Sequence, residues 1–147
     1  MIKHLLAPAK NSASANLALL VLRLWIGSQM LLVHGIDKFA TFKATAPNFP
    51  DPLGIGHTAS LGLAVFAEVF VSPLIVLGLF TRFSALVLII NMTVAFVCVH
   101  KSALTGDNSG ELAFLYLLAY VVLFLAGPGR ISADKLLFGG KAISPGR

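Results

Sequence analysis

Four ionisable side chains that could carry chemistry fall within or beside long apolar runs of the sequence: Arg23, His34, Lys38 and Glu68. A charge near the centre of a bilayer costs roughly 2.5–3.5 kcal/mol even on lenient insertion scales, so such residues are usually paired or functional. We therefore expect Arg23 in the first apolar run to form a buried ion pair with Glu68 in the second. The same residues could also line a polar pocket in which Glu68 takes up a proton or contacts a ligand.

Helical spacing places several of these residues on one face of the first run. Intervals of four, three and four residues separate Arg23, Gly27, Met30 and His34. Asp37 or Lys38 would continue this stripe if the helix extends further, and Gly27 would allow a neighbouring helix to approach closely. Pro73 lacks an amide, which predicts a kink and a free carbonyl beside Glu68. We expect a pocket between the first two runs, lined by His34 and Glu68.

Further polar residues lie where the apolar runs end: His34, Asp37, His57, His100 and Glu111. Imidazoles and carboxylates together can bind a transition metal, but no two of these residues have the i, i+4 spacing of a preformed helical site. We therefore predict no metal site, and expect proton exchange or solvated ends. Asn91, inside the third run, is expected to hydrogen-bond across helices, and the single cysteine, Cys98, to be a buried, inert thiol.

The composition indicates that a membrane-embedded structure positions these residues. Of 147 residues, 57% are apolar and 12% are charged, and the mean hydropathy is +0.89. Soluble domains are about half apolar and a quarter charged, so a soluble enzyme and a disordered chain are both excluded. The net charge of +5 is then typical of contact with lipid headgroups, and we expect a bilayer and no nucleic acid as partner.

The apolar runs predict an all-α, four-transmembrane-helix bundle in a single domain covering residues 1–147. The expected spans are residues 17–36, 59–80, 83–100 and 111–126. A helix needs about 20 residues to cross the hydrocarbon core, with about 17 as the lower limit, so the last two spans are only just long enough. We interpret the first span as a retained helix and not a signal peptide, because no small-residue cleavage pattern follows it.

The distribution of basic residues predicts the orientation of this bundle. Three lie on one side, Lys38, Lys43 and Lys101, and seven on the other, Lys3, Lys10, Arg82, Arg130, Lys135, Lys141 and Arg147. Basic residues favour the cytoplasmic side, so both termini are expected in the cytoplasm of a bacterial or archaeal cell (inner) membrane. Residues 39–58 would then form an extracytoplasmic loop that lies on the membrane surface or folds over the mouth of the bundle. Residues 127–147 would form a cytoplasmic tail, with Ser132 capping an interfacial helical turn that ends at Phe138.

A weak two-fold internal repeat accompanies this layout. Val-His closes both the first and the third span, at His34 and His100, and the ends of the second and fourth spans, residues 77–82 and 125–130, share an apolar-glycine-arginine pattern. Because both halves cross the membrane in the same direction, the axis relating them would lie along the membrane normal.

Taken in order, the polar motifs resemble those of the DoxX family. The stretches that carry the resemblance are Arg23, residues 33–39, Ala67-Glu68, residues 78–82, Val99-His100, Glu111 and residues 127–132, within a match from about Leu17 to Asp134. The resemblance implies a four-helix membrane bundle. It also implies a link to redox chemistry, because the family is named after a subunit of an archaeal thiosulfate:quinone oxidoreductase. No flavin or haem motif occurs in the chain, so such a role would require a quinone or partner subunits.

Three functions remain open at this point. The first is a redox-associated membrane subunit in which Arg23, His34, Lys38 and Glu68 line a quinone-headgroup pocket, supported by Asp37, Asn91, His100 and Glu111, and which acts with partner proteins or as a homo-oligomer. The second is a non-enzymatic scaffold or assembly factor held together by its charged pairs. The third is a small transporter or proton pathway. No cofactor other than a quinone is expected, and an autonomous enzyme is disfavoured.

Overall fold

The structure, a computed structural model, describes residues 13–138, and the regular structure in this range is helical throughout. The first long helix combines α2 (Ala13–Gln29), the π-helical segment η1 (Met30–Gly35) and α3 (Ile36–Ala40). The second combines α5 (His57–Val65), the π-helical segment η3 (Phe66–Val71) and α6 (Ser72–Leu77). The third combines α7 (Thr81–Thr93) and the π-helical segment η4 (Val94–Val99), and the fourth is α8 (Glu111–Ala126). The shorter helices are α4 (Phe42–Thr45), the 3-10 turn η2 (Ala46–Asn48) and α9 (Ala133–Phe138).

Three of these helices are long and apolar enough to cross a membrane: Ala13–Ala40, His57–Leu77 and Thr81–Val99. The expected all-α membrane bundle is thereby confirmed. The first helix is longer than the expected span of residues 17–36, because it continues unbroken to Ala40 and takes up the start of the expected loop. α8 is apolar but has 16 residues, about 24 Å at 1.5 Å per residue, which is less than the hydrocarbon core of about 30 Å.

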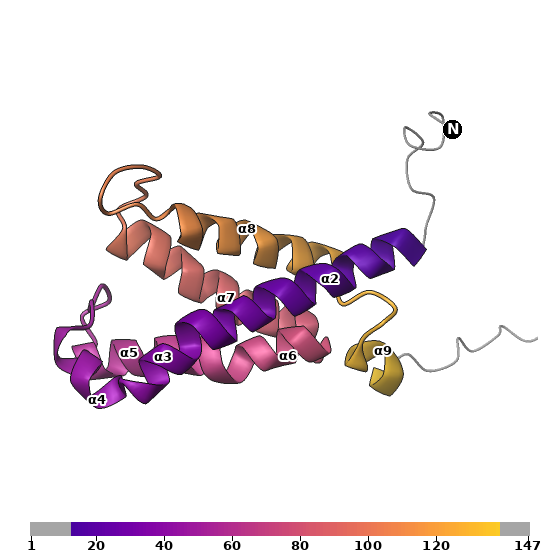
Figure 1. The fold of residues 1–147 in the computed structure, drawn as a ribbon, viewed down its shortest axis with the longest axis horizontal. Helices are drawn as coiled ribbons and strands as arrows, with labels where there is room; N and C mark the ends of the chain where they lie inside the picture. Colours follow the sequence, from indigo (N-terminus) through magenta and orange to yellow (C-terminus); the bar gives the residue numbers. More distant parts are fainter. Residues whose placement is uncertain (1–12, 139–147) are drawn as a thin grey trace, which may run out of the picture.

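The long helices run side by side between two distinct ends of the bundle (Figure 1). One end, which we call the loop end, carries residues 41–56 and 100–110; the other, the tail end, carries the α6–α7 turn and α9. α2 packs along α6, and α7 packs along α8. Four of the basic residues used to predict the orientation, Lys3, Lys10, Lys141 and Arg147, lie outside the described residues, as does the end of the expected tail.

Two glycines allow the first helix to lie directly on the second. A Cβ atom on Gly27 would lie 3.2 Å from the carbonyl oxygen of Ser72, and one on Gly35 would lie 2.8 Å from the carbonyl oxygen of Glu68. Because backbone atoms cannot move aside as a flexible side chain can, any larger residue at Gly35 would push the helices apart. This close approach places the end of η1 beside the helical turn that carries Glu68.

The turn that carries Glu68 has the wider π-helical form. The amide of Ser72 bonds to the carbonyl of Ala67, five residues earlier, and the next residue, Pro73, has no amide to donate. The carbonyl of Glu68 therefore receives neither the Ser72 amide, which bonds to Ala67, nor an amide from Pro73. π-helical segments often occur at functional sites.

The connection after the first helix folds back onto the bundle. Ala46 is buried against Leu61 and Val65 of α5, and Phe42 and Phe49 pack on the same cluster. The loop therefore packs against the bundle, as one of the two expectations for it requires. Its prolines and glycines restrict regular structure to the short turns α4 and η2. We call residues 46–56 the cap loop.

The tail end has the expected capped turn. The amide of Lys135 donates to the Ser132 hydroxyl at 3.2 Å, which is the bond of an N-cap residue to the third helical amide. Leu136, Leu137 and Phe138 at the end of α9 are exposed, as an interfacial helix requires.

Candidate functional site

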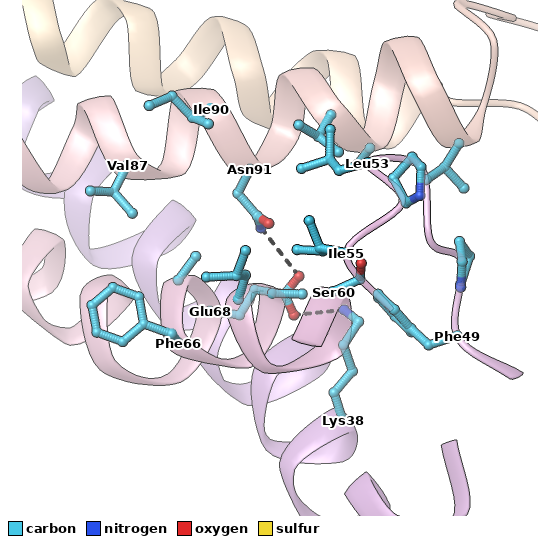
Figure 2. Close-up of a pocket in the computed structure, with 18 residues that line it drawn as sticks. Lys38, Phe49, Leu53, Ile55, Ser60, Phe66, Glu68, Val87, Ile90 and Asn91 are labelled. Atoms are coloured by element: carbon cyan, nitrogen blue, oxygen red, sulfur yellow. Dashed lines mark hydrogen bonds and ion pairs between the residues drawn. The ribbon is translucent and has the colours of Figure 1, made fainter. Parts of the chain in front are cut away.

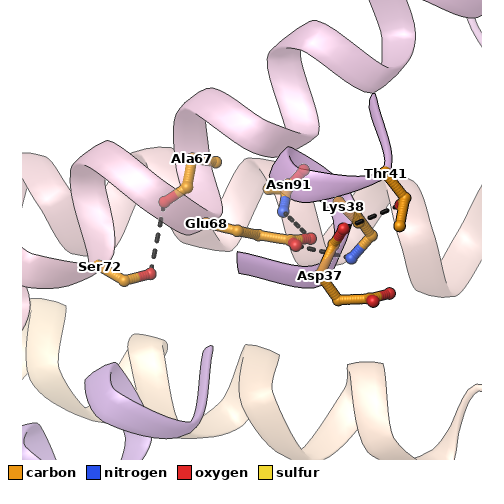
Figure 3. A network of polar contacts seen from close by, with 7 residues as sticks. All are labelled: Asp37, Lys38, Thr41, Ala67, Glu68, Ser72 and Asn91. Atoms are coloured by element: carbon orange, nitrogen blue, oxygen red, sulfur yellow. Dashed lines mark hydrogen bonds and ion pairs between the residues drawn. The ribbon is translucent and has the colours of Figure 1, made fainter. Parts of the chain in front are cut away.

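Glu68 is the centre of a buried polar cluster near the loop end. Its carboxylate accepts a hydrogen bond from the Lys38 ammonium at 2.6 Å and another from the Asn91 amide at 3.5 Å (Figures 2 and 3). The side chain of Glu68 is 5% exposed and that of Lys38 is 26% exposed. Three different helices therefore converge on one carboxylate. The expected cross-helix hydrogen bond of Asn91 is confirmed.

The expected ion pair between Arg23 and Glu68 is wrong. Arg23 is fully buried at the tail end, where its guanidinium donates to the carbonyls of Val76 and Ile131. Its approach depends on Gly78, which has a φ of +69° and no side chain to fill the space that the guanidinium occupies. Arg23 and Glu68 lie towards opposite ends of the bundle, and each has a nearer partner at its own end.

The Arg23 cluster is part of a structural junction. Asp134 of α9 accepts hydrogen bonds from the amides of Phe80 at 2.7 Å and Thr81 at 2.9 Å, and so caps the start of α7. Its own amide donates to the carbonyl of Gly78 at 2.8 Å. Arg23 and Asp134 together join the first helix, the α6–α7 turn and α9, and Arg23 does not line the cavities that border Glu68.

A cavity of about 380 Å³ lies over the Glu68 cluster, between the second and third helices and beneath the cap loop (Figure 2). Its polar residues are Lys38, Ser60, Glu68 and Asn91, and the rest of its wall is apolar. Phe49, Leu53 and Ile55 of the cap loop form its roof, while Phe66 and Ile90 line it and are also exposed on the outer surface of the bundle. This larger cavity is not the one expected between the first two helices, because His34 does not line it and Gly27 and Gly35 bring those helices into contact.

A second, smaller cavity of about 140 Å³ lies on the other side of the ion pair. Its lining includes Met30, His34, Met92 and Tyr116, together with Lys38 and Glu68. The His34 ring meets the Tyr116 ring edge-on, with centroids 5.5 Å apart. His34 therefore lies on the expected inner face but borders this inner cavity and not the larger one. The Lys38–Glu68 pair separates the two spaces.

The remaining expected site residues lie away from the cluster. Asp37 and Glu111 are exposed, and His100 contacts the carbonyl of Asn108 through Nδ1 at 3.2 Å. Among residues 13–138, no three His, Cys, Asp or Glu side chains come close enough to hold a metal ion. Cys98 is exposed, so its expected burial is wrong.

Sequence reasoning missed the residues that hold the cap loop in place. The Asp51 carboxylate accepts hydrogen bonds from the Ser60 hydroxyl at 2.7 Å and from the amides of Gly56 at 2.8 Å and Ile55 at 3.1 Å. The hydrogen bond from Ser60, followed by those from the two amides, lowers the pKa of Asp51. The signal was an aspartate before a Pro-Leu-Gly stretch, since such aspartates bond to nearby backbone amides in turns.

This arrangement suits a ligand that is mostly apolar and carries a hydrogen-bond acceptor at one end. The Lys38 ammonium and the Asn91 amide are donors at the polar end of the cavity, and Glu68 is an acceptor while ionised. Ligand pockets typically measure 300–1,000 Å³, with apolar walls and a few polar groups that fix orientation. The larger cavity meets each of these criteria.

Comparisons with known proteins agree with the fold. The chain is 31% identical over 115 residues to an uncharacterized protein of Haemophilus influenzae, covering 74% of this chain and 83% of that protein. It is 31% identical over 141 residues to an uncharacterized membrane protein of Mycobacterium tuberculosis, covering 82% and 81% of the two chains. No solved structure gives a significant match. The family model of DoxX matches residues 18–101, which include Arg23, His34, Lys38, Glu68 and Asn91, and the chain therefore belongs to the DoxX family.

Proposed function

We propose that this protein is a membrane subunit that binds a quinone headgroup in the cavity over Glu68. The observation that carries the proposal is the position of Lys38, Glu68 and Asn91 at the polar end of an apolar cavity of about 380 Å³. A quinone has two carbonyl acceptors on a flat apolar ring. The Asn91 amide or the Lys38 ammonium would donate to one carbonyl, and the apolar wall would enclose the ring and the start of its tail.

The position of the cavity supports a ligand that arrives from the bilayer. Phe66 and Ile90 are 52% and 57% exposed and also line the cavity, so its apolar side opens towards the region that lipid would occupy. The cap loop covers the opposite, polar side. A lipid-soluble molecule with a long tail could enter between the second and third helices without crossing the water phase.

The same residues support proton exchange with the bound headgroup. Reduction of a quinone to a quinol takes up two electrons and two protons. Glu68 borders both cavities, so it could pass a proton from the side of His34 to the side of the quinone. The chain has no flavin or haem motif, so the electrons would come from a partner protein in the same membrane.

Titration of decylubiquinone into the purified protein in detergent micelles, followed by calorimetry with empty micelles subtracted, tests this proposal. Loss of one hydrogen bond costs about 0.5–1.5 kcal/mol, so Asn91→Leu should weaken binding about two- to tenfold. Thr93→Val is the matched control, because Thr93 is on the same helix, is exposed, and among the described residues bonds only to the carbonyl of Ile89. Saturable binding that Asn91→Leu weakens and Thr93→Val leaves unchanged would support the proposal. Absence of binding would leave a scaffold or a proton pathway as the remaining functions.

We further propose that the loop end faces the outside of a bacterial inner membrane, with both termini in the cytoplasm. In the sequence, seven basic residues are assigned to the side of the termini and three to the side of the first connection, and this distribution supports the orientation. Leu53 is exposed in the cap loop and lies outside the Asp51 hydrogen bonds, so Leu53→Cys on a Cys98→Ala background is a suitable probe. An impermeant maleimide should label it in intact cells; labelling only after lysis would reverse the orientation.

A further inference from the structure

Gln29 places a carboxamide on the outward face of the first long helix, near the middle of the apolar stretch Ala13–Ala40. Arg23, Gly27 and Met30 are buried and define the inward face of this helix. Trp25 and Leu32, on the opposite face, are 68% and 61% exposed. A shallow groove on this outward face is lined by residues of the first helix alone: Val21, Leu24, Trp25, Ser28, Gln29, Leu32 and Val33.

The amide of Gln29 differs from the charged side chains of Glu68 and Arg23 in the long helices. Glu68 is bonded to Lys38 and Asn91, and the guanidinium of Arg23 is bonded to backbone carbonyls. Within residues 13–138, the side chain of Gln29 has no hydrogen-bond partner. Among the buried side-chain atoms of the described residues, Arg23 Nε and the hydroxyls of Thr81 and Tyr120 also lack partners, but all three lie inside the bundle, where no second protein can reach them.

An unpaired carboxamide in hydrocarbon is unfavourable, because lipid tails offer it no hydrogen bond. Its two N–H donors and its carbonyl acceptor make the group self-complementary. Two copies related by a two-fold axis along the membrane normal would carry Gln29 at the same depth on opposing faces. Each amide could then donate to the carbonyl of the other, which a lipid or an unrelated apolar helix cannot reproduce.

We propose that the protein forms a symmetric homodimer through the outward face of its first helix, with Gln29 hydrogen-bonded to Gln29 of the partner subunit. Two-fold dimers are the commonest symmetric assemblies of proteins. Ser28 beside Gln29 is the small residue that close helix approach requires, and Trp25 and Leu32 provide the packing surface. The cavity over Glu68 opens between the second and third helices, so this dimer would leave its entrance to the bilayer free.

Disulfide cross-linking of the full chain in native membranes tests the contact. Leu32 lies on the same outward face and is exposed, so Leu32→Cys on a Cys98→Ala background, which keeps the Gln29 amide, should give a homodimer band on mild oxidation. Leu118→Cys on the same background is the matched control. Leu118 is exposed near the middle of α8, outside the proposed interface, so that only random collisions between protein molecules would cross-link it. Equal cross-linking at both positions, or an adduct with a different protein in place of the homodimer, would overturn the proposal.

Energy transfer between donor- and acceptor-labelled copies in lipid vesicles tests the hydrogen bond itself. One interhelical hydrogen bond contributes about threefold to tenfold to helix association in membranes, so Gln29→Leu should weaken the dimer by at least about threefold. Gln29→Asn keeps the amide and should retain more of the association than Gln29→Leu does. Association of Gln29→Leu at wild-type strength would overturn the proposal. Because Gln29 is remote from the Glu68 cavity, none of these outcomes depends on quinone binding.

Discussion

The Lys38–Glu68 pair gives the sharpest prediction about the stability of the bundle. Glu68 is 5% exposed and its only partners among residues 13–138 are Lys38 at 2.6 Å and Asn91 at 3.5 Å. Removing one partner of a fully buried ion pair costs about 3–5 kcal/mol. Lys38 is 26% exposed, which lowers this value, and we expect Lys38→Met to reduce the free energy of unfolding by about 2–3 kcal/mol. Glu68→Gln should cost less, about 1 kcal/mol, because it removes a buried charge while Lys38 can still reach water or headgroups.

The double variant separates this interaction from general damage. If the two side chains stabilise each other, Lys38→Met with Glu68→Gln should lose about 1–3 kcal/mol less than the sum of the single variants. Reversible unfolding in mixed detergent and dodecyl sulfate micelles, followed by circular dichroism, measures each free energy. A parallel cycle of Arg23→Leu with Glu68→Gln is the control, and should be additive within about 0.5 kcal/mol because the two share no partner. Additive losses for Lys38 and Glu68, or strong coupling of Arg23 to Glu68, would refute the arrangement of the two clusters.

Three further predictions concern the contacts that hold the site and the two ends together. Gly35→Ala places a methyl group 2.8 Å from a backbone carbonyl and should cost about 1–3 kcal/mol in melting experiments, whereas Gly62→Ala, with nothing within 4 Å, should be neutral or slightly stabilising. Because the pKa of Asp51 is lowered in the folded protein, its contribution to holding the cap loop is present above the ordinary carboxyl pKa of about 4 and is lost as the pH falls through the lowered value. A spin label at Leu53→Cys should thus become mobile on acidification, and in Asp51→Asn it should be mobile at every pH. Asp134→Ala removes the cap of α7 and should cost about 0.5–2 kcal/mol in the same melting experiments; an unchanged melting temperature would contradict the capping role.

The fold could be predicted from the sequence because its main signals are local. Long apolar runs indicate helices, the four-three-four spacing of Arg23 to His34 defines an inward face, and Ser132 is a recognisable helix cap. Each of these depends on residues close together in the chain. The length of the first helix was less well predicted, because a polar stretch such as residues 36–40 can continue a helix when neighbouring helices pack against it.

The partners of the charged residues could not be predicted in the same way. Arg23 and Glu68 were the obvious pair by residue type, but the choice between Glu68 and a set of backbone carbonyls depends on where Gly78 and Ile131 lie in three dimensions. The position of the pocket likewise depends on Gly27 and Gly35, which bring the first two helices into contact and leave the open space between the second and third. The role of the cap loop as a roof required the contacts of Phe49 and Ala46 with a helix that follows them.

The most direct measurement of the central claim is photoaffinity labelling with an azido-benzoquinone that carries a short isoprenoid tail, followed by peptide mass spectrometry. We predict adducts within residues 49–55, 63–68 and 87–95, which line the cavity over Glu68, and loss of these adducts when excess decylubiquinone competes. Adducts spread over the exposed faces of the helices, or concentrated at residues 21–33 and insensitive to the competitor, would contradict a quinone site in this cavity.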